Sequence, residues 1–485
     1  MDVPSEAPRL AAPQEVRSLI LTLKPHKAPG EDGITAPLLK AFSRKALVYL
    51  TMLINACLLL HHFPACWKNA VTIFLHKPGK DGRHPGNYRP ISLLRLLSKI
   101  LEKVIVVRLL EEASRLEAIP VFQHGFTPGR STTTQLQRVI DIIVSHLNMR
   151  RSTVLVCLDL SKAFDSVWHH GLLYKLHRAG FSLGIIRILY SYLTNRTYQP
   201  RVGQTLGPHR PVRCGVPQGS VLGPHLFNLY TADIPTPPHT TLAICADDTA
   251  IIAASMNTAR ARDLAQDALD TTCAFYRRWL LQNNAGKTSA MIFGKGFYSR
   301  PQALTHNGTT IPWTSSLTYL GLRLDSRLSF AGHIRATASK AQKARGALLP
   351  LIRCRGSLSP ELKLRIYNTC LRPIITYGVP VWLPYVSTSS WALLQRFQNV
   401  CVKHSLGRTR FSSTTQAHEL SNQPSSCPTA TNYISATTER PGKTQPPISV
   451  AAARTWHHRS TANVPVQQLW LPRIDWFEFY ALFPC

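Results

Sequence analysis

Acidic residues are scarce in this chain of 485 residues, which has 25 Asp and Glu against 56 Lys and Arg. The formal net charge is +31, and no single basic tract accounts for it, because the excess is spread along the chain. A distributed basic excess with an isoelectric point above 9 is typical of proteins that bind nucleic acids. Charge alone leaves open a basic secreted protein, a ribosome-associated protein or a simple solvated surface.

Long apolar runs are also missing. The stretch 47–60 is apolar, but it is too short to span a bilayer and is interrupted by Asn55. Residues 1–10 have neither the charged start nor the apolar centre of a secretory signal peptide. We therefore expect a soluble intracellular protein of the cytoplasm and nucleus that is not secreted, has no transmembrane segment and has no membrane partner.

The cysteines form no recognisable metal or disulfide pattern. There are 11 of them, with no CxxC pair and no Cys/His spacing of a zinc knuckle. Several lie inside apolar stretches, as Cys57, Cys157 and Cys370 do. They are interpreted as small buried residues in a reducing compartment, and no structural zinc is expected.

Carboxylates follow two short apolar segments that lie far apart in the sequence. The β-rich segment 154–158 runs directly into Asp159, and the segment 242–246 ends in Asp247 and Asp248. On its own, a pair of aspartates in a turn is usually only turn chemistry. Carboxylates at the ends of two buried strands are also what a two-metal phosphoryl-transfer site requires, with two Mg²⁺ ions about 3.5–4 Å apart. The surrounding motifs decide between these interpretations.

An ordered series of motifs surrounds these carboxylates. The first half of the series is "KPGKDGRHPGNYRPISLL" (77–94), "QHGFTPGRSTTTQL" (123–136) and "LDLSKAFDSVWHHGLLYKL" (158–176). The second half is "GVPQGSVLGPHLFNLYTADI" (215–234), "CADDTAII" (245–252), "NNAGKTSAMIF" (283–293), "TYLGLRLDSRLSF" (318–330) and "LSPELKLRIYNTCLRPIITYGVPVW" (358–382). In this order, over roughly residues 20–405, the chain resembles the reverse transcriptase of a non-LTR (LINE-type) retrotransposon, and most of all the Jockey-like clade.

The resemblance implies an α+β fold of the right-hand polymerase type, with fingers, palm and thumb and a four-to-five-stranded antiparallel palm sheet. We expect an N-terminal extension at 1–45, fingers and palm at 46–325, and a thumb at 326–405. Strands at 290–293 and 318–324 are expected to close the palm. Residues 406–485 become rich in Ser, Thr, Pro and Gln and lose all periodicity, so a disordered low-complexity tail is expected there.

The resemblance also assigns the metal ligands. Asp159 and Asp247 would bind two Mg²⁺ ions, for which Mn²⁺ is a possible substitute, and Asp248 adds charge beside them. The backbone carbonyl of Leu160 would complete the shell of one ion. Asp165, in the same motif, is interpreted as structural. The implied reaction is RNA-directed addition of deoxynucleoside monophosphates to a primer 3′-OH, driven by positioning and electrostatics.

Three residues are expected near the incoming nucleotide. Phe164 would lie under the sugar and exclude a 2′-OH, although without the motif it would be interpreted as a core residue at a strand-to-helix turn. Gln218 begins a turn that opens a helix and would lie near the nucleotide. Gly219, beside it, would let the backbone approach the template.

Basic residues complete the expected site. By resemblance, Arg89 would bind the triphosphate, since a guanidinium suits phosphate oxygens, and Arg130 would touch the template or close the fingers. The plainer alternative for either is an exposed arginine. Lys287 would donate a proton to the leaving pyrophosphate. The hairpin at 319–321 would grip the primer end, and the thumb would supply basic residues to the duplex, among them Lys340, Lys343 and Arg345.

Two departures from the family pattern stand out. The position before "ADD" is usually Tyr or Phe in this family, and here it is Cys245, which predicts poorer placement of the primer end. Nothing in roughly the first 20 residues resembles the endonuclease of full-length elements, so the chain is interpreted as a fragment or a degenerate copy. The rival hypothesis is therefore an inactive nucleic-acid-binding relic; a domesticated maturase-like protein is a third. Expected partners are an RNA template, a DNA primer, dNTPs and an element-encoded RNA-binding protein.

Overall fold

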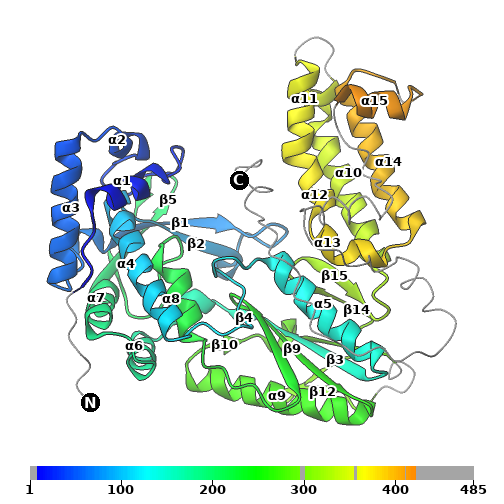
Figure 1. Cartoon of the computed structure of the whole chain (residues 1–485), viewed down its shortest axis with the longest axis horizontal. Helices are drawn as coiled ribbons and strands as arrows, with labels where there is room; N and C mark the ends of the chain where they lie inside the picture. Colours follow the sequence, from blue (N-terminus) through cyan, green and yellow to red (C-terminus); the bar gives the residue numbers. More distant parts are fainter. Residues whose placement is uncertain (1–7, 295–300, 354–357, 410, 422–485) are drawn as a thin grey trace, which may run out of the picture. The chain divides into compact units, whose positions relative to one another are not determined.

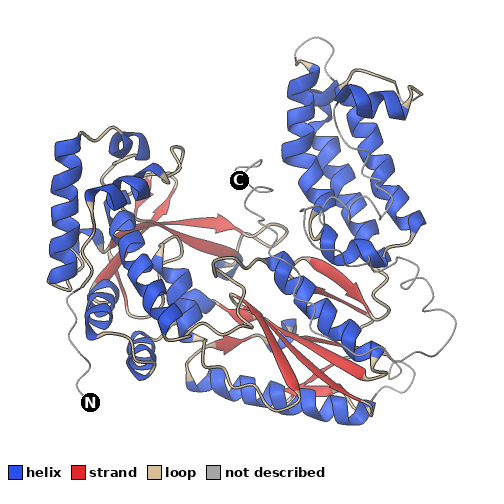
Figure 2. Cartoon of the chain, viewed as in Figure 1, coloured by secondary structure: helices blue, strands red, loops and turns tan. Residues whose placement is uncertain are grey.

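The computed structural model describes residues 8–294, 301–353, 358–409 and 411–421 (Figure 1). The chain divides into two compact units, Met1–Thr314 and Ser315–Cys485, and each is described by itself. Helices and mainly antiparallel strands are mixed in the first unit (Figure 2), as the expected α+β class requires. None of the described helices is long and apolar enough to cross a membrane.

A four-stranded antiparallel sheet lies in the first unit and confirms the expected palm sheet. Its order is β11-β3-β9-β8, with bounds Ser289–Phe293, Ser152–Leu158, Asp248–Ser255 and Thr240–Cys245. Alternate side chains of β3 enter the main core, which also holds the apolar face of helix α9 (Thr258–Arg278). Helix α5 (Thr132–Asn148), which begins with a capping box at Ser131, packs against β3 and β8. The strands next to the aspartate motifs, β3 and β9, are therefore the centre of this sheet.

A second sheet carries the basic loop motif. Its order is β2-β1-β5-β6, with β7 also paired to β5, and the bounds are Tyr88–Leu93, Asn69–His76, Arg196–Val202, Thr205–Leu206 and Arg210–Val212. β1 and β2 are antiparallel, whereas β1 and β5 are parallel. The remaining short strands pair locally: β4 (Leu160–Ser161) with β10 (Gln282–Asn283), and β12 (Leu304–His306) with β13 (Thr309–Ile311).

Helices surround these sheets in the first unit (Figure 1). They are α1 (Pro13–Leu21), α2 (Ala36–Lys40), α3 (Arg44–Leu59), α4 (Leu96–Arg115), α6 (His169–Arg178), α7 (Leu183–Leu193) and α8 (Leu222–Tyr230). Short 3₁₀ segments lie at Ala65–Trp67, Pro85–Asn87, Ala163–Ser166 and Ala285–Lys287.

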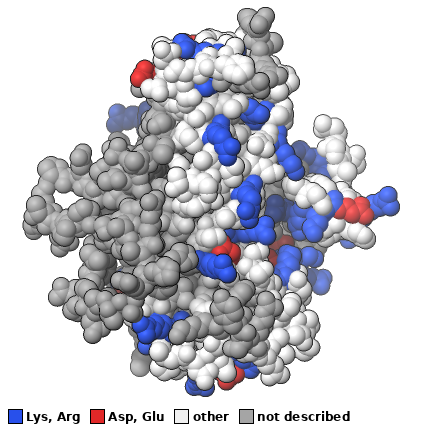
Figure 3. Space-filling view, turned by 90° about the vertical axis from the view of Figure 1, so that its right-hand side faces the viewer, with Lys and Arg blue, Asp and Glu red and all other residues white. Residues whose placement is uncertain are grey.

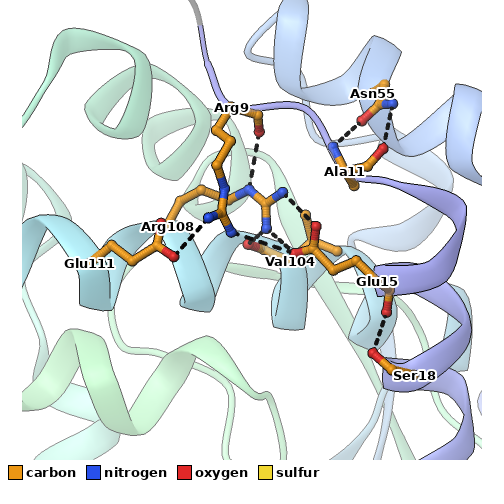
Figure 4. A network of polar contacts seen from close by, with 8 residues as sticks. All are labelled: Arg9, Ala11, Glu15, Ser18, Asn55, Val104, Arg108 and Glu111. Atoms are coloured by element: carbon orange, nitrogen blue, oxygen red, sulfur yellow. Dashed lines mark hydrogen bonds and ion pairs between the residues drawn. The ribbon is translucent and has the colours of Figure 1, made fainter.

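The N-terminal segment is tied into this unit by a polar network (Figure 4). The guanidinium of Arg108 on α4, which is 7% exposed, donates to both carboxylate oxygens of Glu15 and to the backbone oxygen of Arg9. This pairing lowers the pKa of Glu15. Asn55 on α3 exchanges two hydrogen bonds with the backbone of Ala11, at 2.7 and 3.0 Å. The predicted N-terminal extension therefore shares the core of the helices that follow it.

The second unit consists of a β-hairpin followed by helices. The hairpin pairs β14 (Ser316–Tyr319) with β15 (Leu322–Asp325). The helices are α10 (Ala331–Arg353), α11 (Pro360–Ile366), a π-helical turn at Tyr367–Leu371, α12 (Arg372–Thr376), α13 (Val379–Trp382), a 3₁₀ turn at Leu383–Tyr385, α14 (Thr388–Ser405) and α15 (Thr414–Ser421). Helices α10 and α11, the π turn and the elements up to α14 lie in the segment 326–405, where the thumb is expected.

Two expectations about elements are corrected by this arrangement. The segment 318–324 was predicted as one palm strand, but it is a hairpin that pairs with itself in the second unit, because Leu320 and Gly321 turn the chain at positive φ angles of 45° and 78°. The segment predicted to be disordered from residue 406 contains helix α15 at Thr414–Ser421. The rest of that prediction falls on residues 422–485, outside the described part of the chain.

Candidate active site

Three carboxylates lie at one end of the central sheet because of its register. Leu158 at the end of β3 pairs with Thr249 of β9, so Asp159 and Asp248 extend the two strands side by side. Cys245, at the end of β8, pairs with Asp248, which leaves Ala246 and Asp247 as a two-residue turn. Segments nearly 90 residues apart in the sequence are thus brought together at one edge.

The electrostatics show that these carboxylates repel one another. Burial, together with the charges of Asp247 and Asp159, raises the pKa of Asp248 to about 6. Burial and the charge of Asp159 likewise raise the pKa of Asp247, whereas the charges of Lys287 and Arg89 lower it. Raised pKa values at two half-buried carboxylates, Asp247 and Asp248, are a feature of functional sites, since negative charge has accumulated without full compensation.

The ammonium group of Lys287 lies beside these carboxylates and partly neutralises their negative charge. Its Nζ donates to Oδ2 of Asp159 at 2.6 Å. The backbone brings it there: β10 pairs with β4 immediately after Asp159, and the amide of Asn284 donates to the carbonyl of Asp159 at 3.0 Å. The 3₁₀ turn Ala285–Lys287 then carries the lysine to the carboxylate.

The donor set suits hard divalent cations, since Mg²⁺ and Mn²⁺ prefer carboxylate and carbonyl oxygens. The repulsion between Asp159, Asp247 and Asp248 is also what a bound cation would relieve. In the described parts of the chain no three Cys, His, Asp or Glu side chains are placed so that together they could hold a metal ion. The carboxylate of Asp159 instead accepts from Lys287. Leu160 buries its side chain in β4, so only its backbone carbonyl is suited to a ligand role.

The start of the motif 123–136, to which the sequence analysis gave no role, holds the aspartate turn. The side-chain oxygen of Gln123, a residue 2% exposed, accepts from the amide of Ala246 at 3.1 Å and from the amide of Gly125 at 2.7 Å. Ala246 has a φ of 59°, a strained conformation for a residue with a side chain. A Cβ on Gly125 would lie 2.2 Å from the nitrogen of Ala246, so glycine is required there.

The same segment is fixed along its length. The amide of His124 donates to the carbonyl of Ile244 at 2.8 Å, and the amide of Ile244 donates to the carbonyl of Phe122 at 2.9 Å. Gln135, fully buried on α5, donates to the same two carbonyls at 3.0 Å each. The segment 122–125 therefore runs beside β8 and supports the turn that carries Asp247.

Arg130, expected at the template or in finger closure, has other contacts. Its Nη1 donates to the carbonyls of Pro120 and Gln123, at 2.8 and 2.6 Å. This arginine therefore organises the loop that holds the aspartate turn. A template contact by Arg130 stays a prediction.

Phe164 lies in the 3₁₀ turn that follows β4, and its ring is part of an aromatic cluster. Its ring stacks on Phe227 of α8, with centroids 5.0 Å apart and planes at 29°. The edge of Phe126 meets it at 6.2 Å. The ring is half-buried, so it has both the packing of a core residue and a face that is accessible.

The turn with Gln218 and Gly219 joins β2 to the 3₁₀ turn Ala163–Ser166. The side-chain amide of Gln218 donates to Oδ1 of Asp165 at 3.0 Å, and its carbonyl accepts from the amide of Ser92 on β2 at 2.8 Å. Gly219 has a φ of 115°, and a Cβ there would lie 2.7 Å from the carbonyl oxygen of Ser92. The role of Asp165 agrees with its structural interpretation, since it positions Gln218.

Helix α8, which follows this turn, is held by a buried carboxylate that sequence reasoning missed. Glu102 of α4 is fully buried and accepts from the amides of Val221 and Leu222, at 2.6 and 3.1 Å. These amides are among those left unpaired at a helix start. Only the occurrence of a glutamate within the apolar face of α4 could have indicated this role.

Two further expected residues have clear positions. Arg89 is exposed on β2, opposite Leu75 of β1, and is near enough to Asp247 for its charge to lower the pKa of that carboxyl. Cys245 is 8% exposed, and burial together with the neighbouring aspartates raises its pKa to about 11. The thiol is therefore neutral at physiological pH and packs as an apolar side chain.

Comparison with known proteins agrees with this geometry. Residues 75–324 match the family "Reverse transcriptase (RNA-dependent DNA polymerase)". The probable RNA-directed DNA polymerase from transposon BS of Drosophila melanogaster is 34% identical over 395 residues, or 80% of this chain and 43% of that protein. The polymerase from mobile element jockey of the same species is 35% identical over 377 residues, or 76% of this chain and 41% of that protein.

The chain thus spans about two fifths of the length of these curated relatives, 43% and 41%. Among solved structures, a telomerase of Candida tropicalis is similar with a TM-score of 0.38 and 12% identity, over 81% of this chain and 67% of that one. The chain belongs to the reverse transcriptase (RNA-dependent DNA polymerase) family, and its expected resemblance to non-LTR elements of the jockey type is confirmed.

Proposed function

We propose that this protein is an RNA-directed DNA polymerase that extends a DNA primer on an RNA template with dNTPs. The observation that carries the proposal is the placement of Asp159, Asp247 and Asp248 at one edge of the central sheet, with Lys287 bonded to Asp159. Family membership over residues 75–324 supports the same reaction.

In this reaction the primer 3′-oxygen attacks the α-phosphorus of the dNTP, a new P–O bond forms, and the bond to pyrophosphate breaks. Asp159, Asp247 and the carbonyl of Leu160 would hold two Mg²⁺ ions, which supply charge neutralisation when bound and for which Mn²⁺ is a substitute. Lys287 would give its proton to the departing pyrophosphate. Asp248 would keep the primer side of the turn negative.

The remaining residues would place the nucleotide. Arg89 would bind the triphosphate, because it is exposed on β2 and acts electrostatically on Asp247. Phe164, fixed by its stacking on Phe227, would present a ring edge to the sugar and disfavour a 2′-OH. Gln218 and Gly219 would form the adjoining wall, since their turn is hydrogen-bonded to β2 and to Asp165.

The basic surface supports a nucleic-acid substrate. On the face shown in Figure 3, Lys and Arg side chains are far more frequent than Asp and Glu. Phosphate contacts of this kind give affinity without sequence selection. We include an RNA template, a DNA primer and an element-encoded RNA-binding protein as the partners in this proposal.

The direct test is primer extension by the purified protein on poly(rA) with an oligo(dT) primer. We expect Mg²⁺-dependent incorporation of dTTP, with UTP incorporated far more slowly. Absence of extension with both Mg²⁺ and Mn²⁺, while the duplex is still bound, would favour the alternative of an inactive nucleic-acid-binding relic.

A further inference from the structure

The turn that carries Lys287 has little packing of its own. The 3₁₀ turn Ala285–Lys287 buries none of its side chains, and the strand before it, β10, is only two residues long. The turn is closed by the carbonyl of Asn284, which accepts from the amides of Lys287 and Thr288 at 3.1 and 3.2 Å and from the hydroxyl of Thr288 at 3.1 Å. A support from outside the turn is therefore needed to keep the lysine in place.

The imidazole of His306, the last residue of β12, spans the base of this turn and is 1% exposed. Its Nε2 lies 2.7 Å from Nδ2 of Asn283, the residue that ends β10. Its Nδ1 lies 3.1 Å from Oγ1 of Thr288, the residue before β11. One buried ring thus contacts both the residue that precedes Asn284 and the residue that follows Lys287.

The hydrogen-bond partners assign a role to each nitrogen of this ring. The hydroxyl of Thr288 donates to the carbonyl of Asn284, so its oxygen accepts from Nδ1–H of His306. Nε2 then carries no proton and accepts from the side-chain amide of Asn283, which also donates to Sγ of Cys273 at 3.1 Å. Burial lowers the pKa of His306, which favours this neutral ring. The network is complete only with a neutral imidazole at its centre.

The strand that carries His306 is itself anchored, because β12 lies beside α9 (Figure 1). Gln266 of α9 exchanges two hydrogen bonds with the backbone of Thr305, at 2.9 Å each. Leu304 on β12 and Ile311 on β13 are buried in the main core. The position of the ring is therefore fixed by α9 and the core, and not by the turn that it supports.

We propose that His306 is a positioning residue, which holds the turn Ala285–Lys287 so that the ammonium group of Lys287 stays at Asp159 and is aligned with the leaving pyrophosphate. The inference rests on the proposed function of Lys287 as the proton donor. The hydrogen bonds of the ring go to Asn283 and Thr288, so His306 acts through the turn and not on the substrate. Loss of the ring would leave both buried partners unpaired and let the turn move.

The first test needs no catalysis. Acylation of lysines by acetic anhydride, followed by mass spectrometry, reports how firmly Lys287 is held to Asp159. In His306→Leu we expect Lys287 to react about threefold faster than in wild type, the size of one partly exposed ion pair. The matched control is Leu304→Ala, which unpacks the same strand and keeps the contacts of the ring, so Lys287 should react as in wild type. Lys45, exposed on α3, should react equally in all three proteins.

The second test is single-turnover extension at saturating dTTP, where His306→Leu is expected to be about tenfold slower than wild type. Two dTTP analogues refine it, with a methylene or a difluoromethylene group between the β- and γ-phosphorus. The difluoromethylene leaving group is the weaker base and needs a proton less, so the loss in His306→Leu should be smaller with it. Leu304→Ala should have a lowered melting temperature and extend within about twofold of wild type with every nucleotide.

Two further variants separate positioning from stability. His306→Gln keeps an acceptor for Asn283, so it should lose less activity than His306→Leu, and it replaces that variant in both tests if His306→Leu does not fold. The double variant His306→Leu/Lys287→Met should be no slower than Lys287→Met alone, because a positioning residue has no effect once the group that it positions is gone.

Unchanged acylation of Lys287 in a folded His306→Leu would overturn the proposal. Equal slowing with both analogues, or additive losses in the double variant, would also overturn it and leave His306 as a core residue. If wild type extends no primer while acylation responds to His306 as expected, the polymerase proposal fails and the support of the turn stands. If wild type extends primers and His306→Leu extends them equally fast, only this inference fails.

Discussion

Lys287 and Asp159 are joined by a hydrogen bond of 2.6 Å, although 128 residues separate them in the sequence. The lysine is thereby held against the carboxylates while it remains 62% exposed, so its ammonium group can exchange Asp159 for a phosphate oxygen. This geometry gives the lysine two possible roles, as a compensating charge and as a proton donor.

Replacing Lys287 distinguishes these two roles. Lys287→Met is expected to slow nucleotide addition by about 10²-fold, because the proton donor is lost, with the Kd for the duplex unchanged. Lys287→Arg keeps the positive charge but gives up its proton far less readily, so it should be nearly as slow. Single-turnover extension measures both, and a full rate for Lys287→Arg would show that charge alone is required.

Asp248 makes stability depend on pH. Its pKa in the folded protein is about 6, against an ordinary 3.8, so the charged form is disfavoured by folding. The folded state therefore binds more protons than the unfolded state between these values, and stability from this group falls as pH rises from about 4 to about 6. Without metal, the melting temperature of wild type relative to Asp248→Asn should fall across this window and then level off.

The control for this titration is Asp267→Asn, on the exposed face of α9. Its melting curve should run parallel to that of wild type at every pH. A constant difference between wild type and Asp248→Asn from pH 4 to 8 would contradict the raised pKa.

Gln123 positions the turn that carries Asp247. Gln123→Leu leaves the amides of Gly125 and Ala246 without their acceptor, at a cost of about 1–3 kcal/mol each. We expect a lower melting temperature together with slower extension at saturating dNTP, while the duplex Kd stays unchanged. Gln137→Leu, which removes an amide that bonds Asp141 on the surface of α5, is the matched control. Normal extension by a folded Gln123→Leu would limit this residue to stability.

The sequence predicted the carboxylate strands well because each strand and its aspartate are contiguous. It could not predict the support of the turn, since Gln123 reaches Ala246 across 123 residues and nothing local marks the contact. The pairing of β4 with β10, which delivers Lys287, rests on two-residue strands that have no sequence signature. The segment 318–324 alternates apolar and polar residues as a strand does, but the turn at Leu320 and Gly321 divides it into the two strands of a hairpin. The start of the disordered tail was predicted too early, because α15 has little apolar periodicity from which a helix could be predicted.

Because Cys245 stands where the family usually has Tyr or Phe, we expect this protein to be a weak polymerase. A thiol lacks the area of the Tyr or Phe ring that usually stands before this motif, and a 1 Å misplacement of the primer end can cost about 10²-fold in rate. Cys245→Tyr or Cys245→Phe is therefore expected to raise single-turnover extension. Because the thiol is only 8% exposed, a ring can also overpack the turn. Equal or slower extension with a lowered melting temperature would show that the cysteine is already accommodated.

The most direct test of the active-site assignment is Asp247→Asn, assayed on poly(rA) with oligo(dT) beside Asp267→Asn. Removing one of the carboxylates proposed to bind metal should abolish extension, with RNA binding nearly intact, and the α9 control should extend like wild type. Extension by Asp247→Asn at near the wild-type rate would contradict the assignment of this sheet edge as the catalytic centre.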